Sequence, residues 1–150
     1  EVGMFTGYSA MGMAESLPAD GELHTCELMD QHINTAKGFF KKSKFGDQIT
    51  IHGGEALHSL ENLSANTFDL IFIDADKKNY IKYYNRAMTL LKNHGMIILD
   101  NMLWSGGVVN PKTDEDIILN ELNSIIANDQ RNINVLLPIR DGVMVCFKHE

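Results

Sequence analysis

Short apolar runs alternate with stretches of helical period along most of the chain, and this alternation limits the choice of fold. The apolar runs, bounded by Gly, Asp or Asn, lie at 23–28, 48–51, 68–73 and 96–99. The stretches of helical period lie at 8–17, 31–44, 56–63, 79–91 and 114–127. Strands that alternate with helices predict an α/β fold with a doubly wound, mostly parallel sheet.

Two parts of the pattern refine this prediction. The run 68–73 is almost continuously apolar, which indicates a central parallel strand covered on both faces. At the end of the chain, the strand-like runs 133–137 and 143–148 are joined by only residues 138–142. That segment is too short for a helix and contains Asp141-Gly142, so we expect an antiparallel pair and a reversed C-terminal strand.

Length and composition indicate one domain over 1–150. The chain has 150 residues, 44% of them hydrophobic, enough for a full core. It starts at Glu1-Val2-Gly3 without Met, and these residues resemble the end of a strand, so we expect a chain that lacks its N-terminal part.

Charge and cysteine content narrow the partners and the compartment. The formal net charge of −7 disfavours a broad surface for nucleic acid or anionic membrane. Cys26 and Cys146 are far apart with no CxxC, which predicts reduced, buried thiols in a cytoplasmic protein. No apolar stretch is as long as a membrane-spanning helix, which needs about 18 residues.

A glycine loop and a following acidic residue favour a nucleoside site. Gly3 and Gly7 lie between a strand end and a helix, where the backbone can approach a ligand closely. Glu27 ends the next strand, about 20 positions beyond the loop, the spacing at which a carboxylate meets ribose hydroxyls in such folds. Gly54 and Ala56 follow the third strand and leave space for a flat base, although an ordinary turn is an equally good interpretation.

The strongest chemical signal comes from two strand ends that are expected to be neighbours. Asp74 follows the run 68–73, and Asp100 with Asn101 follows the run 96–99. Carboxylate and amide oxygens suit Mg²⁺, Ca²⁺ or Mn²⁺ better than zinc. Each pair taken alone is more often a turn or a helix cap; taken together they predict a metal site.

These residues resemble the cation-dependent class I S-adenosylmethionine O-methyltransferases of the caffeoyl-CoA and catechol type, which have a Rossmann-like fold. The matching stretches are EVGMFTGYSA, FDLIFIDADKKNY, LDNMLWSGGV and LLPIRDGVMV. The resemblance covers essentially all of the chain. Family members carry about 60 or more further residues before this point, including helices that help to form the substrate mouth and the dimer.

The resemblance implies a role for each matching position. The methionine part of the cofactor would be held by Glu1, Gly3 and Ser9, with Asp76 and Tyr83 near its amino-acid end. Glu27 would bind the ribose hydroxyls, where the family more often has Asp, and Gly54 and Ala56 would border the adenine. The metal would be bound by Asp74, Asp100 and Asn101, and Lys77 matches the proposed general base.

The implied chemistry is consistent with elementary acidity. A phenol has a pKa near ~10, so transfer of a methyl group to its oxygen needs help in forming the anion. A divalent cation supplies that help, and Lys77 needs a lowered pKa to accept the proton. Trp104 flanks an aromatic substrate or anchors its loop, with little to choose between the two.

We therefore expect a magnesium-dependent methyltransferase that acts on a catechol-like small molecule, as a homodimer. One alternative is a tRNA enzyme that methylates a hydroxylated uridine, which the acidic balance disfavours without excluding. Another is a nucleoside-binding chain without catalysis. A nicotinamide dehydrogenase is weaker still, because the G-x-G-x-x-G fingerprint is missing.

Overall fold

The computed structural model describes residues 1–149. The chain divides into two compact units, an N-terminal unit, Glu1–Asn62, and a C-terminal unit, Leu63–Glu150, and each is described by itself. The prediction of a single domain over 1–150 stays a prediction.

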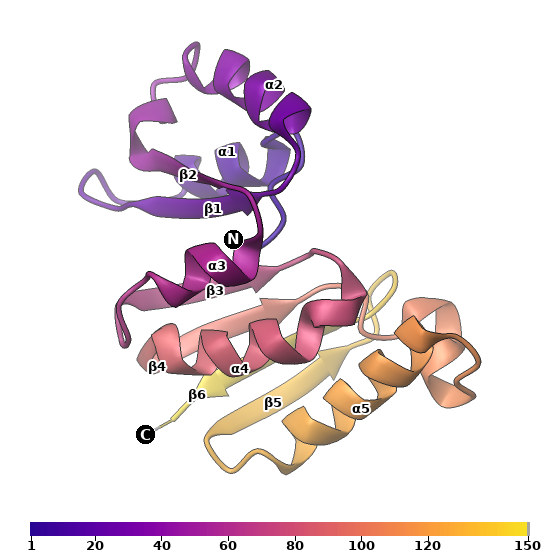
Figure 1. Cartoon of the computed structure of the whole chain (residues 1–150). Helices are drawn as coiled ribbons and strands as arrows, with labels where there is room; N and C mark the ends of the chain where they lie inside the picture. Colours follow the sequence, from indigo (N-terminus) through magenta and orange to yellow (C-terminus); the bar gives the residue numbers. More distant parts are fainter. Residues whose placement is uncertain (150) are drawn as a thin grey trace. The chain divides into compact units, whose positions relative to one another are not determined.

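The N-terminal unit is built around two parallel strands (Figure 1). Its elements are α1 (Tyr8–Glu15), β1 (Leu23–Glu27), α2 (Asp30–Phe40), the 3-10 turn η1 (Gly46–Gln48), β2 (Ile49–Gly53) and α3 (Ala56–Glu61). Ahead of α1, Val2 forms a parallel bridge with Cys26 of β1. The first residues therefore run alongside β1 as a strand would, as the sequence predicted.

The core of this unit joins α1 and α2 to β1 and β2, whose Leu23, Ile49 and Ile51 pack against it. Met4, Ala10 of α1, and Ile33, Ala36 and Phe40 of α2 are buried together. The packing is tight at Gly7, where φ is +87° and a Cβ would lie 2.7 Å from the Phe40 ring. Only glycine fits at this turn into α1.

The C-terminal unit contains a four-stranded sheet in the order β3-β4-β6-β5. Its elements are β3 (Phe68–Ile73), the 3-10 turn η2 (Lys77–Asn79), α4 (Tyr80–Leu90), β4 (Leu91–Leu99), the 3-10 segment η3 (Trp104–Val109), α5 (Asp114–Asn128), β5 (Asn132–Leu137) and β6 (Val143–Lys148). β3 and β4 are parallel, and β6 is antiparallel to both β4 and β5. The predicted reversed C-terminal strand is confirmed.

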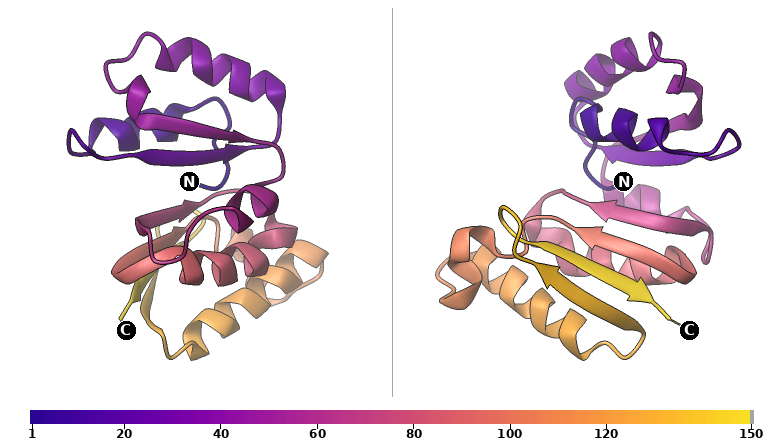
Figure 2. Two further views of the ribbon diagram at one scale, coloured as in Figure 1. Left: turned by 60° about the vertical axis from the view of Figure 1, so that its left-hand side comes forward. Right: turned by 180° about the vertical axis from the view of Figure 1, so that it is seen from behind.

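Helices α4 and α5 lie on the same face of this sheet, and the view from behind shows the strands in front of them (Figure 2). Ile71 and Ile73 of β3 are buried on the covered face. Leu70, on the opposite face, is 46% exposed. Two residues of the same cross-strand row are also partly exposed, Phe147 at 37% and Ile133 at 66%. The prediction that 68–73 is covered on both faces is thus wrong for these residues, because both long helices of this unit lie on the other face of the sheet.

The largest differences from the predicted element boundaries are in β4 and α2. β4 begins at Leu91 rather than at 96, although residues 92–94 are polar and His94 has φ +65°. α2 ends at Phe40 rather than at 44. The last long helix, α5, is capped by Thr113, whose side chain accepts a hydrogen bond from the Asp116 backbone N–H.

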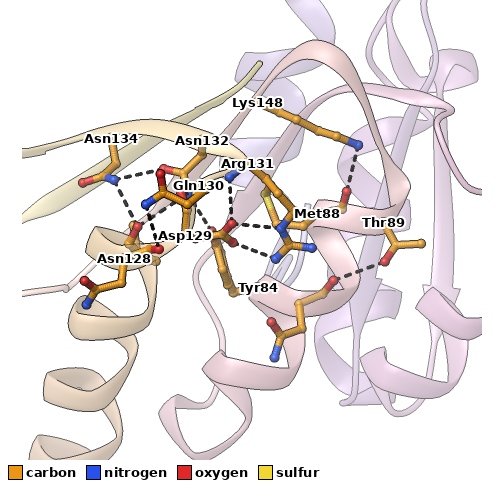
Figure 3. Close-up of polar contacts among 12 residues, drawn as sticks. Tyr84, Met88, Thr89, Asn128, Asp129, Gln130, Arg131, Asn132, Asn134 and Lys148 are labelled. Atoms are coloured by element: carbon orange, nitrogen blue, oxygen red, sulfur yellow. Dashed lines mark hydrogen bonds and ion pairs between the residues drawn. The ribbon is translucent and has the colours of Figure 1, made fainter. Parts of the chain in front are cut away.

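A polar network ties the end of α5 to α4 (Figure 3). Asp129 accepts hydrogen bonds from the Tyr84 hydroxyl at 2.8 Å and from Arg131 Nε and Nη2 at 2.9 and 2.6 Å. These donors, Arg131 first, hold the pKa of Asp129 well below its ordinary value. Lys148 Nζ donates to the carbonyl oxygens of Met88 and Leu91 at 3.0 and 2.8 Å, which fixes the last strand against the α4–β4 junction.

Both cysteines are free and buried, as predicted, and burial raises the pKa of the Cys146 thiol to about 12. Over residues 1–149, none of the helices has the length and apolar character that crossing a bilayer requires.

Candidate active site

Asp74 and Asp100 occupy equivalent positions at the ends of two neighbouring strands. Ile73 and Leu99 are paired in register in the parallel β3–β4 ladder, and each aspartate is the next residue. The Asp100 N–H donates to the Ile73 carbonyl oxygen at 3.1 Å, which keeps the two strand ends together. The prediction that these two strands are neighbours is confirmed, and the convergence of the side chains on a metal stays a prediction.

The donor atoms at this edge suit a hard divalent cation. The Asp74 side chain is 44% exposed, and its only described contact is with Lys77 at 3.4 Å. Asp100 Oδ1 accepts the Asn101 N–H at 2.7 Å, and Asn101 adopts φ +62°, a conformation that asparagine tolerates better than most residues. Two carboxylates and an amide match the oxygen ligands of Mg²⁺, which usually keeps several waters.

Among residues 1–149, no group of three or more His, Cys, Asp and Glu side chains is arranged to hold a metal ion. The set predicted at this edge is of a different kind, two carboxylates with the Asn101 amide, and its binding of a metal stays a prediction.

Lys77 is a buried amine beside this edge. The residue is 8% exposed. Its Nζ donates to the Tyr80 hydroxyl, to the Ala75 carbonyl oxygen at 3.2 Å and to Asp74 Oδ1 at 3.4 Å. Burial lowers the pKa of Lys77, and the nearby carboxylates, Asp74 foremost, oppose that shift. The lowered pKa that a general base requires therefore arises from the protein itself.

Tyr80 joins Lys77 to both strand ends and was not singled out from the sequence. Its side chain is fully buried, and its hydroxyl donates towards the carbonyl oxygens of Asp100 at 3.2 Å and Ile73 at 3.4 Å. Burial raises the pKa of Tyr80 far above its ordinary value. The hydroxyl is therefore a neutral hydrogen-bonding group that fixes the position of Lys77.

The loop after β4 is held by the turn between β5 and β6. The backbone N–H groups of Met102 and Leu103 donate to the carbonyl oxygens of Gly142 and Asp141 at 2.9 and 2.8 Å. The Ser105 N–H donates to the Asp141 side chain at 2.5 Å. The Trp104 ring lies 5.6 Å from Lys77 Nζ. This geometry is compatible with both predicted roles of Trp104.

Asp76 and Tyr83, both predicted at the amino-acid end of the cofactor, contact each other directly. The Tyr83 hydroxyl donates to Asp76 Oδ1 at 2.6 Å, and Asn79 Nδ2 donates to Oδ2 at 2.7 Å. Asp76 itself is exposed, whereas Tyr83 is buried. The two donors thus hold the exposed Asp76 carboxylate in one orientation.

In the N-terminal unit, the Glu1 carboxylate lies between two hydroxyl groups. The Ser9 hydroxyl donates to Oε1 at 2.5 Å, and the buried Thr25 hydroxyl donates to Oε2. Gly3, with φ +100°, donates its N–H to the Cys26 carbonyl oxygen at 3.2 Å. The structure therefore brings the predicted residues Glu1 and Ser9 together, and adds Thr25, whose role depends on the pairing of residues 1–4 with β1.

Glu27 is a buried carboxylate with donors on both oxygens. Oε2 accepts the Phe5 N–H at 2.7 Å, and Oε1 accepts the Met29 N–H at 2.9 Å. His32 Nδ1 lies 3.0 Å from Oε1. The side chains of Phe5, Leu28 and Met29 are 63, 62 and 51% exposed, so apolar groups surround a polar centre, as is common in ligand sites.

Gly54 and Ala56 follow β2 close to Glu27. The Gly54 N–H donates to the Glu27 carbonyl oxygen at 2.9 Å. Gly54 has φ +103°, and a Cβ there would meet no atom within 4 Å. The open space agrees with the prediction that small residues leave room for a flat group, while the binding of adenine stays a prediction.

The similarity to known proteins extends over almost the whole chain. The O-methyltransferase family model matches residues 1–149. The chain is 36% identical over 159 residues to caffeoyl-CoA O-methyltransferase 1 of Eucalyptus globulus, covering 97% of this chain and 64% of that protein. It is 35% identical over 160 residues to caffeoyl-CoA O-methyltransferase 1 of Arabidopsis thaliana, covering 97% of this chain and 61% of that protein. The chain thus spans less than two thirds of the length of these relatives.

Solved structures agree in fold. An O-methyltransferase from Bacillus cereus in complex with SAH has a TM-score of 0.89 at 28% identity, over 98% of this chain and 72% of that one. An SAH-bound methyltransferase from Podospora anserina has a TM-score of 0.88 at 28% identity, over 99% and 70%. The predicted α/β, Rossmann-like methyltransferase fold with a mixed sheet is confirmed. Since both the family model and relatives above 30% identity cover nearly every residue, this chain belongs to the O-methyltransferase family, with the caffeoyl-CoA O-methyltransferases among its relatives.

Proposed function

We propose that this chain is the core of an S-adenosylmethionine-dependent O-methyltransferase that methylates one hydroxyl of a catechol-like small molecule with the help of a divalent cation, Mg²⁺ before Ca²⁺ or Mn²⁺. One observation carries the proposal: two open carboxylates at neighbouring strand ends lie beside a buried lysine of lowered pKa. Asp74, Asp100 and Asn101 would hold the cation. The bound cation would supply charge that stabilises the anionic form of the acceptor oxygen.

Lys77 would then act as the general base. Its neutral amine would accept the proton of the acceptor hydroxyl. The sulfonium cofactor, when bound, would supply the methyl group to the acceptor oxygen and would leave as the neutral thioether. The buried position of Lys77 supports this role, because burial favours the neutral form that can accept a proton.

The remaining matched residues would bind the cofactor. Glu27 would accept hydrogen bonds from the ribose, and Gly54 and Ala56 would border the adenine. The methionine part would be held by Glu1, Gly3, Ser9, Asp74, Asp76 and Tyr83. Two of the solved relatives are described as bound to SAH, which supports the choice of cofactor.

The net charge of the chain favours a small molecule as the methyl acceptor. The formal charge of −7 offers a tRNA no broad basic surface, so a small diol is the better acceptor than a hydroxylated uridine. The homodimer and the cytoplasmic location stay predictions.

Calorimetric titration tests cofactor and metal together. The 150-residue chain is titrated with S-adenosylmethionine, with and without a chelator, and then assayed on catechol and on tRNA. We expect binding of the cofactor, methylation of catechol only with Mg²⁺, and no methylation of tRNA. Asp74→Ala and Asp100→Ala should each abolish the metal-dependent turnover while the far-ultraviolet circular dichroism stays unchanged.

Each contrary outcome removes a separate part of the proposal. Metal-dependent turnover retained in both variants would remove the metal assignment. Methylation of tRNA but not of catechol would reassign the acceptor, and cofactor binding without any turnover would favour a non-catalytic nucleoside-binding chain.

A further inference from the structure

A histidine next to Glu27 has no role in the function proposed above. His32 lies in the first turn of α2, five residues after Glu27, and its Nδ1 is 3.0 Å from Glu27 Oε1. Its side chain is 29% exposed, against 9% for that of Glu27. The imidazole is therefore placed between a buried carboxylate and the surface.

The donors around Glu27 leave little freedom for a ligand. A carboxylate offers about four acceptor positions. Three of them are taken by Phe5 and Met29 N–H groups and by His32 Nδ1, two on Oε1 and one on Oε2. The one position that remains is on Oε2, so the orientation of this oxygen decides whether a ligand hydroxyl can bind.

The Phe5 ring restrains the imidazole from its other side. The Phe5 and His32 ring centroids are 4.5 Å apart, with an edge-on arrangement of 67°. Phe5 has φ +52°, a left-handed conformation that is strained for an aromatic residue and is found mostly at functional sites. The strained backbone of Phe5 places its N–H on Glu27 and its ring on His32.

We propose that His32 is a positioning residue for the cofactor ribose: by donating from Nδ1 to Glu27 Oε1, it fixes the carboxylate so that Oε2 meets a ribose hydroxyl. This inference rests on the proposed function, because it takes Glu27 as the ribose ligand. It adds a residue that acts through Glu27 rather than by touching the ribose itself.

The test measures affinity rather than turnover. S-adenosylhomocysteine and its 2′,3′-dideoxy analogue are titrated by calorimetry into the wild-type chain and into His32→Ala, His32→Gln and His32→Asn. Alanine removes the donor, and glutamine carries its amide beyond the position of Nδ1. Asparagine can place its Nδ2 close to the position of Nδ1 and serves as the rescue variant.

We expect His32→Ala and His32→Gln to weaken the binding of S-adenosylhomocysteine about tenfold, because a carboxylate that is free to turn must be oriented at the cost of binding free energy. The affinity for the dideoxy analogue should be the same in every variant as in the wild type. His32→Asn should recover most of the lost affinity for S-adenosylhomocysteine. Asn34→Ala, at an exposed position of the same helix, is the matched control and should change neither affinity. Circular dichroism and the calorimetric stoichiometry report whether each variant is folded.

The outcomes separate this inference from the function on which it rests. If the wild type binds S-adenosylhomocysteine and the alanine and glutamine variants bind it equally well, the role of His32 is overturned and the proposed function stands. An equal loss for both ligands would show a merely structural role and overturn it as well. If the folded wild type binds neither ligand, the proposed cofactor and this inference both fall.

Discussion

The carboxylates predicted to bind the cofactor and those predicted to bind the metal are held in opposite ways. In the N-terminal unit, Glu1 accepts two hydroxyl donors, and Glu27 accepts two backbone N–H groups with His32 beside it. In the C-terminal unit, within residues 63–149, the Asp74 side chain contacts only Lys77, at 3.4 Å, and the Asp100 side chain accepts only the N–H of the next residue. Each carboxylate of the first pair is held by two or three protein donors, close to saturation in Glu27, whereas each of the second pair has one donor and is left open.

This difference indicates what each pair can bind. A carboxylate that is already surrounded by donors is fixed in orientation and keeps few acceptor positions, which suits a neutral hydroxyl group. Two open carboxylates at adjacent strand ends repel each other and attract a cation. The contrast is one of role rather than of unit, because Asp129 in the C-terminal unit is also saturated, by Tyr84 and Arg131.

The largest expected effect comes from Asp100→Asn. The asparagine oxygen can still accept the Asn101 N–H, so the free energy of unfolding without metal should stay within about 0.5 kcal/mol of the wild type. The loss of charge should remove the rise in Tm that Mg²⁺ gives the wild type, and should lower kcat at least about 100-fold. Differential scanning fluorimetry with and without Mg²⁺, followed by a methylation assay, measures both.

Asp69→Asn is the matched control for this variant. Asp69 lies on β3 as an 82% exposed carboxylate paired with Lys92, so its loss should cost about 0–1 kcal/mol and leave the metal response intact. A metal response that survives Asp100→Asn would mean that the open carboxylates do not form a cation site.

A smaller effect is expected from Asp129→Asn, in the saturated carboxylate that has no proposed ligand. The Asp129 side chain is 8% exposed and accepts from Tyr84 and from Arg131, so its replacement should cost about 1–3 kcal/mol at pH 7. Because these donors hold the pKa of Asp129 well below its ordinary value, the stabilisation is fully present above about pH 4 and is lost as the pH falls through the folded-state pKa.

Urea unfolding at pH 7, 5 and 3 measures this dependence. The difference between the wild type and Asp129→Asn should be constant from pH 7 to 5 and should narrow at pH 3. A difference that stays constant to pH 3 would show that the carboxylate is not the group that stabilises the network in Figure 3.

The sequence predicted elements best where one pattern filled the whole element. β3 and β6 begin and end at the predicted residues, and α3 starts at Ala56 as expected. The first half of β4 was missed, because residues 92–94 are polar and lie at an irregularity of the ladder, between the Leu91 and Met96 pairs, so they show no strand pattern.

The same limit applies to the site. Asp74 and Asp100 could be predicted, because each directly follows an apolar run and parallel strand ends share an edge. Thr25, His32 and Tyr80 could not, since their roles depend on which backbone or side-chain atom the fold brings within hydrogen-bonding distance. A spacing in the sequence indicates a shared edge but does not specify these contacts.

The smallest effect tests whether Glu1 belongs with the saturated carboxylates. Thr25 is fully buried and donates to Glu1 Oε2, while Ser9 holds Oε1, so Thr25→Val keeps the shape and removes one of two donors. We expect a loss of about 1 kcal/mol in the free energy of unfolding, the usual net value of one hydrogen bond, and less than about a threefold change in S-adenosylhomocysteine affinity. The control is Thr35→Val on α2, where an exposed hydroxyl donates to the Gln31 carbonyl oxygen at 2.9 Å and its loss should change stability by less than about 0.5 kcal/mol. If urea unfolding finds the two variants equally stable, Glu1 does not depend on its buried donor and behaves like the open Asp74, so saturation by protein donors no longer separates the two groups.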